Sequence, residues 1–139
     1  AGRILSIYMV IRTLAAAFSL RLGGHVQFIR PLILPMAEGA AAGKEGALSE
    51  TDREGLKGLA GAVENYGNFY GQNIFVASGG VLLIVGTLTE LGYQVDPLDV
   101  AKASIPIAII ATILAVIQFL LFDRRLNRRG RNRGEGSKA

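Results

Sequence analysis

The 139-residue sequence contains no cysteine and only one histidine, His25. The absence of cysteine excludes a disulfide framework, a thiolate metal site and a cysteine nucleophile. A single histidine leaves no paired His/Asp/Glu spacing for a metal, and the chain has neither a G-x-S-x-G motif nor a phosphate-binding loop. We therefore predict that the protein is not an enzyme and that it holds no metal or other cofactor.

Charge is also missing from two long windows, residues 65–89 and 103–122. A helix needs about 20 apolar residues to cross a hydrocarbon core of about 30 Å. Pro106 falls in the first turn of the second window, where the missing amide hydrogen costs little. We predict an all-α, polytopic membrane protein fragment with a transmembrane helix in each window, although the pair Gly79 and Gly80 could interrupt the first helix.

Positive charge is concentrated after the second window. Residues 1–122 hold eight Lys/Arg against nine Asp/Glu, so the formal charge of +4 comes from the tail, residues 123–139. Basic residues that flank a span are retained on the cytoplasmic side. We therefore expect a bacterial inner (cytoplasmic) membrane protein with a cytoplasmic C-terminus. The alternative, a basic arm that binds nucleic acid, is less well supported because the tail directly follows a span.

The N-terminal segment, residues 1–36, is apolar but interrupted. We predict a third transmembrane helix in residues 4–20, but Arg12 lies in its middle, so either this arginine faces a bundle interior or the segment is not a simple span. Pro35 breaks the next apolar stretch, which indicates a re-entrant or discontinuous element within residues 25–40. The chain does not start with methionine, so we interpret it as a fragment or a processed product; if residues are missing upstream, we expect further spans among them.

Between the apolar segments lies a hydrophilic connector, residues 37–64, which we expect on the cytoplasmic side. Ser49 followed by Asp52 predicts a helix start. Leu56, Leu59, Ala60 and Val63 follow at helical spacing and predict one apolar face. The remaining segments are residues 65–122, with two transmembrane helices and a short outside loop, and the basic tail.

Two polar clusters interrupt the apolar background. The first contains His25 and Arg30; an arginine can clamp a carboxylate with two hydrogen bonds, and a histidine can relay a proton. The second contains Asn68, Gln72 and Asn73; on a helix, Asn68 and Gln72 share one face, which suits a lactam or an amide. The simpler alternatives are an interfacial turn for the first cluster and interhelical packing with an aromatic belt for the second.

Three stretches carry a resemblance to a family of bacterial membrane proteins. They are GHVQFIRPLILPMAEGA (residues 24–40), GQNIFVA (residues 71–77) and LFDRRL (residues 121–126). Together they resemble the family known as domain of unknown function nine-six-nine. The resemblance implies a subunit of a two-protein permease for 5-oxoproline (pyroglutamate), paired with a second multi-span membrane protein.

These observations lead to one hypothesis and one rival. The hypothesis is a subunit of a secondary transporter in the lipid bilayer, with a small organic anion bound near His25, Arg30, Asn68, Gln72 and Asn73. The rival is a membrane scaffold or assembly protein that transports nothing. Neither involves nucleic acid.

Overall fold

The computed structural model describes residues 1–20, 22–42 and 48–136, and all the regular structure in these ranges is helical. The predicted all-α class is confirmed. The elements are α1 (Gly2–Ala17), the π-helix η1 (His25–Ile33), α2 (Leu34–Ala42), α3 (Glu50–Gln72), α4 (Gly79–Glu90) and α5 (Pro97–Gly136).

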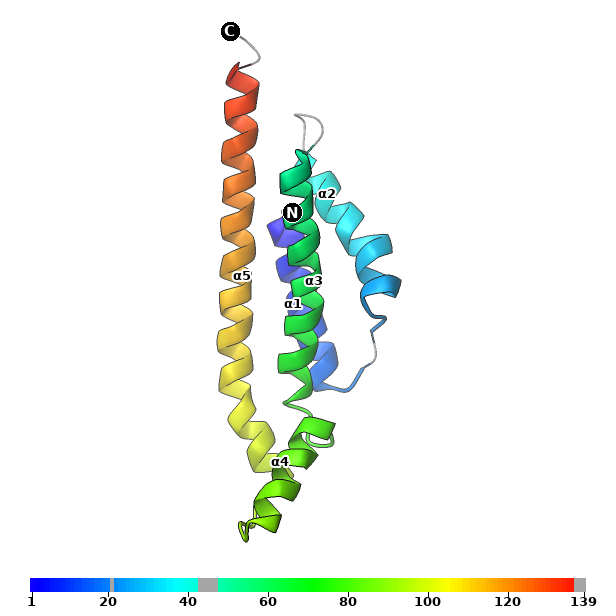
Figure 1. Cartoon of the computed structure of the whole chain (residues 1–139), viewed down its shortest axis with the longest axis vertical. Helices are drawn as coiled ribbons and strands as arrows, with labels where there is room; N and C mark the ends of the chain where they lie inside the picture. The colour runs from blue at the N-terminus through cyan, green and yellow to red at the C-terminus, as the bar shows by residue number, and fades with distance from the viewer. Residues whose placement is uncertain (21, 43–47, 137–139) are drawn as a thin grey trace.

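Helices α1 and α3 run parallel, and the long helix α5 runs antiparallel to both (Figure 1). The arm formed by η1 and α2 returns along the other side of α1 and α3, while α4 extends beyond their ends. The packed core lies where α1, α3 and α5 meet, and it contains Leu5, Met9, Leu56, Val63 and Phe119, each 0% exposed.

One stripe of α3 forms its contact face. Leu56, Ala60 and Val63 are fully buried, which confirms the apolar face predicted from their spacing. The stripe continues through Gly67 and Gly71, which are also buried. The buried face of α3 therefore changes from large side chains to glycines along its length.

The two glycines bring α3 and α1 into close contact. A Cβ atom placed at Gly67 would lie 2.7 Å from Cγ of Arg12, and one at Gly71 would overlap the carbonyl oxygen of Thr13 and lie 2.6 Å from Cβ of Ala16. Glycines four residues apart allow this approach between membrane helices. Any side chain at either position would push the helices apart.

Helix α3 begins where the sequence predicted. The Ser49 hydroxyl accepts a hydrogen bond from the Asp52 amide at 3.2 Å, so Ser49 is the N-cap. We expect Ser49→Ala to lower the free energy of unfolding by about 1 kcal/mol, because a helix amide loses its partner. Thermal unfolding in detergent would measure this; a loss no larger than that of Thr51→Ala, at an exposed position, would contradict it.

The first uncharged window, residues 65–89, is not one continuous helix. Helix α3 ends at Gln72, and Ser78 starts α4 by accepting a hydrogen bond from the Val81 amide. The 12 residues of α4 extend about 18 Å, short of the ~30 Å hydrocarbon core. The break therefore falls just before the glycine pair that we considered as an interruption.

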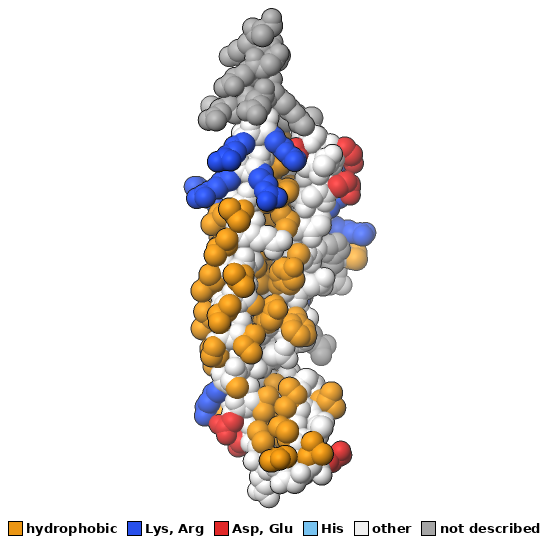
Figure 2. All heavy atoms as spheres, turned by 60° about the vertical axis from the view of Figure 1, so that its left-hand side comes forward, with side chains coloured by type: hydrophobic (Ala, Val, Ile, Leu, Met, Phe, Trp, Pro, Cys, Tyr) orange, Lys and Arg blue, Asp and Glu red, His pale blue; other side chains and the backbone are white. Residues whose placement is uncertain are grey.

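Among the described helices, one is long and apolar enough to cross a membrane: the stretch Pro97–Arg129 of α5. Only 17% of its most apolar window is buried. Figure 2 shows many exposed hydrophobic side chains along this face of the molecule, with Lys and Arg gathered above them at the upper end. Helix α5 is thus a candidate membrane helix, and the number of spans stays a prediction.

The N-terminal segment is also helical but short. Helix α1 has 16 residues and ends at Ala17, close to Ser19, which adopts a positive φ of 57°. The discontinuous element expected within residues 25–40 corresponds to η1 and α2, and the geometry changes from π to α between Ile33 and Leu34. Pro31 lies inside the π-helix. The depth of η1 and α2 in a membrane stays a prediction.

Candidate functional site

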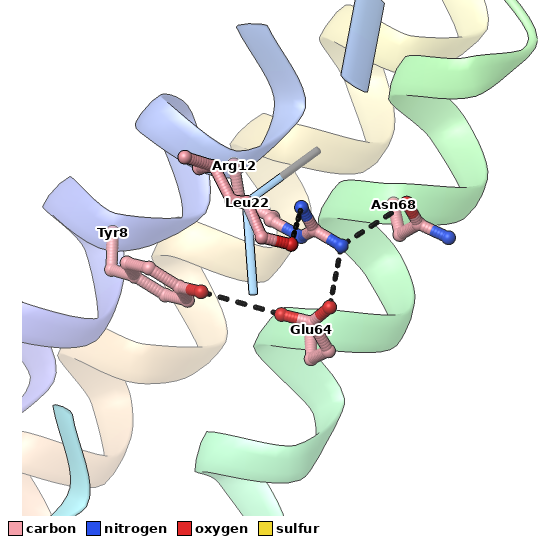
Figure 3. A network of polar contacts seen from close by, with 5 residues as sticks. All are labelled: Tyr8, Arg12, Leu22, Glu64 and Asn68. Carbon is pink, nitrogen blue, oxygen red and sulfur yellow. Dashed lines mark hydrogen bonds and ion pairs between the residues drawn. The ribbon is translucent and has the colours of Figure 1, made fainter. Parts of the chain in front are cut away.

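The most unusual feature of the interior is a buried ion pair between α1 and α3. Nη2 of Arg12 lies 2.5 Å from Oε1 of Glu64, and the side chains of Arg12 and Glu64 are 7% and 12% exposed. The same nitrogen donates to Oδ1 of Asn68 at 3.2 Å, and Nη1 donates to the carbonyl oxygen of Leu22 at 3.3 Å (Figure 3). The guanidinium thus joins α1, α3 and the segment before η1.

Tyr8 completes this network. Its hydroxyl donates to Oε2 of Glu64 at 3.3 Å, so both carboxylate oxygens accept a hydrogen bond (Figure 3). The Tyr8 ring stacks on Phe28 of η1, with ring centroids 5.8 Å apart. Tyr8 therefore positions Glu64 and also holds the η1 arm against α1.

Helical spacing explains how four side chains meet. Tyr8 and Arg12 are four residues apart on α1, and Glu64 and Asn68 are four residues apart on α3, so each pair projects from one face. Gly67 lies between the α3 pair and leaves room for the aliphatic part of Arg12. The network therefore depends on the glycine contact described above.

The guanidinium is not fully paired. Nε of Arg12 is buried and has no hydrogen-bond partner among the described residues. Buried polar atoms are normally paired, so an unpaired donor marks either a cost to stability or a group available to a ligand. Arg12 also lines an open cavity, but Nε is itself buried, so a ligand there could reach this atom only if the surrounding side chains moved.

This cavity has a volume of about 410 Å³ and lies between α1, α3 and the start of η1. It is lined by Arg12, Ala16, Ser19, Leu20, Leu22, Gly23, Gln27, Asn68 and Gln72. The volume is within the range of small-molecule sites. A guanidinium and three side-chain amides among the described lining residues provide donors and acceptors for a polar anion.

The candidate site residues predicted from the sequence do not all lie at this cavity. Asn68 and Gln72 both line the cavity, as their shared helix face predicted. Nδ2 of Asn73 donates to the Phe69 carbonyl at 2.9 Å and closes the end of α3. Arg30 is exposed on η1 and is not among the described lining residues. His25 begins η1, but its side chain lies outside the part of the chain that the structure describes.

A second hollow adjoins the same amide face. It has a volume of about 500 Å³ and is lined by Asn65, Tyr66, Asn68, Phe69, Tyr70 and Gln72. Asn68 and Gln72 therefore take part in both hollows. This shared edge lets both residues contact a ligand in either hollow.

Sequence reasoning did not find the partnership of Tyr8, Arg12 and Glu64. Arg12 was expected either to face a bundle interior or to mark a segment that is not a simple span, and the structure buries its side chain against α3. The available signal was an isolated charge of each sign beside an apolar stretch, Arg12 and Glu64. Two such charges can lower each other's burial cost by pairing.

A comparison with known protein families identifies the family of this chain. The family described as "Protein of unknown function (DUF969)" matches residues 1–127. The chain belongs to this family. The DUF969 match confirms the resemblance found in three stretches of sequence, and it includes α1 to α4 and most of α5. No curated protein and no solved structure matches the chain.

Proposed function

We propose that this DUF969 protein is a subunit of a secondary transporter for a small organic anion. The main observation that supports this proposal is the buried Arg12 side chain, which has an unpaired Nε and lines an open cavity. In bundles of membrane helices, ionisable groups that face the interior mark substrate and ion pathways. The proposal places the protein in the bacterial inner membrane, with the tail cytoplasmic and a second multi-span protein as partner.

The chemistry of the cavity suits 5-oxoproline, the substrate that the family resemblance implies. This anion carries one carboxylate and one lactam. A carboxylate pairs well with a guanidinium, and a lactam both donates and accepts hydrogen bonds as a side-chain amide does. Arg12 would hold the carboxylate, and Gln72 with Gln27 would bind the lactam.

Glu64 limits how Arg12 can bind an anion. Its carboxylate already accepts from Nη2 and Nε is buried, so a substrate carboxylate would have to compete with Glu64 or reach Nε after the surrounding side chains have shifted. Competition of this kind gives a transporter two states, one with the Arg12–Glu64 pair closed and one with Arg12 bound to substrate. The Arg12–Glu64 pair is thus compatible with a contact that opens during transport as well as with a permanent one.

Gln72→Leu tests the proposal with little risk to the fold, because Gln72 is exposed at the end of α3. We expect uptake of radiolabelled 5-oxoproline to fall about ten-fold or more, since a lost hydrogen bond to a polar substrate costs roughly 1.5 kcal/mol or more. The measurement uses cells that express the full-length protein with its partner, and the membrane level of each variant is measured in parallel.

Gln94→Leu is the matched control, because Gln94 is an exposed amide in the connection between α4 and α5. It should transport as the wild type does. Equal uptake by the Gln72→Leu and Gln94→Leu variants would exclude the cavity as the substrate path. No uptake by well-expressed wild-type protein with its partner would remove 5-oxoproline and favour the scaffold alternative.

A further inference from the structure

A second site lies on the other side of the molecule, along the seam between α3 and α5. An open groove of about 430 Å³ is lined by Leu59, Leu114, Ile117, Gln118, Leu121, Phe122 and Arg125. A smaller hollow of about 230 Å³ shares Leu114 and Gln118 with it and extends the seam toward Tyr70. The groove takes no part in the proposed transport path, because it has no lining residue in common with the Arg12 cavity.

The chemistry of the groove changes along its length. Leu114, Ile117 and Leu121 provide apolar walls, and Arg125 lies at one end. This end coincides with the upper boundary of the hydrophobic surface of α5, where the basic side chains gather (Figure 2). Arg125 is exposed there. A ligand that fits must be apolar over most of its length and anionic at one end.

The length of the groove matches one leaflet of a bilayer. Leu114 and Arg125 are eleven residues apart on α5, which corresponds to about 16 Å along the helix axis. One leaflet contributes about half of the ~30 Å hydrocarbon core. If α5 crosses the membrane, Arg125 lies at the level of the phosphate groups when Leu114 lies near the midplane.

The single arginine at the end of apolar walls favours a lipid over a partner helix as the occupant. A phospholipid carries its phosphate at one end of its hydrocarbon chains, which is the pattern that the groove offers. A partner helix would need an acidic side chain at that one level, whereas every anionic lipid of the leaflet presents its phosphate there.

We propose that this groove is a binding site for one anionic phospholipid, with an acyl chain along the α3–α5 seam and the phosphate on Arg125. A guanidinium can hold a phosphate with two parallel hydrogen bonds. Gly55 helps to form the wall: a Cβ atom there would lie 3.2 Å from the Phe122 ring, so the glycine gives this ring its place beside the groove.

Variants of two neighbouring arginines distinguish a specific lipid site from general electrostatic attraction between the basic residues and anionic lipid. The full-length protein is purified in detergent, and native mass spectrometry compares bound phosphatidylglycerol with bound phosphatidylcholine. We expect the wild type to prefer phosphatidylglycerol and Arg125→Gln to weaken its binding about ten-fold or more. Arg124→Gln removes the same charge from an exposed residue outside the described lining, and it should weaken binding about five-fold at most.

A second pair of variants tests the acyl chain. Leu121→Trp places a larger side chain in the groove, whereas Leu120 is exposed next to it and outside the described lining. We expect Leu121→Trp to reduce the binding of both lipids about ten-fold and Leu120→Trp to leave it unchanged. Equal losses in the Arg124→Gln and Arg125→Gln variants, or in the two tryptophan variants, would overturn the proposal. So would a purified complex in which the partner protein crosslinks to position 121 and excludes lipid.

Discussion

Replacement of Glu64 by leucine is expected to lower the free energy of unfolding by about 3–5 kcal/mol. The leucine would leave the Arg12 guanidinium buried, with only the Asn68 and Leu22 oxygens as partners. A buried charge without a counter-charge is one of the largest effects that a single substitution can have. Thermal or denaturant unfolding of the detergent-purified protein would measure the loss.

The control is Glu54→Leu on the same helix. Glu54 pairs with Lys57 in solvent, and this hydrogen bond lowers the pKa of the Glu54 carboxyl group. Exposed pairs contribute little to stability, so this variant should unfold almost as the wild type does.

A double variant separates the ion pair from simple packing. Arg12→Met with Glu64→Leu removes both charges, and well-packed apolar residues can replace a buried pair at little cost. We therefore expect the double variant to recover most of the stability lost in Glu64→Leu. Equal stability of the Glu64→Leu and Glu54→Leu variants would show that the buried pair does not hold α1 to α3.

Gly71→Val is expected to have the second-largest effect, a loss of about 3 kcal/mol or more. The new side chain would overlap the backbone of α1 at the Thr13 carbonyl, and backbone cannot move aside as the end of a flexible side chain can. Overpacking usually costs about 1–3 kcal/mol, and the rigid obstacle places this case at the upper end. The same unfolding measurement applies.

Gly58→Val is the matched control, because a Cβ atom at Gly58 meets nothing within 4 Å. Both variants exchange glycine for valine within α3, so much of the change in intrinsic helix preference is common to them, although Gly71 lies in the last turn. The difference between them therefore reports mainly the α1–α3 contact. If Gly71→Val unfolded at the same temperature as Gly58→Val, the close approach of the two helices would be disproved.

Local rules in the sequence predicted several elements well. Ser49 caps α3 because its hydroxyl reaches an amide only three residues away, and the uncharged run of residues 103–122 lies within α5. The stripe from Leu56 to Val63 depends only on the period of the helix. Such signals lie within a few residues of one another, so a single sequence contains them in full.

The break at the end of α3 was harder to predict. Hydropathy treats residues 65–89 as one apolar stretch, but Asn73 closes α3 and Ser78 caps α4 through side-chain hydrogen bonds. These polar side chains compete with the continuing helix for backbone partners. Average hydropathy does not detect that competition.

The candidate site combines residues that are close in sequence with residues that are far apart in sequence. Asn68 and Gln72 were found together because four residues separate them on one helix. Arg12 and Glu64 meet only because Gly67 and Gly71 bring parallel helices together, and a single sequence does not show which helices become neighbours. Arg30 was predicted as the carboxylate clamp of a polar cluster at an expected helix break, whereas the arginine at the cavity wall comes from α1.

The separation of Arg12 from Glu64 also has a consequence during synthesis. The two residues are 52 positions apart, and a ribosome adds about 5–20 residues each second. About 3–10 s therefore pass between the appearance of the arginine and that of its counter-charge. Helix α1 therefore cannot form this ion pair, or complete its contact with α3, until α3 has been made.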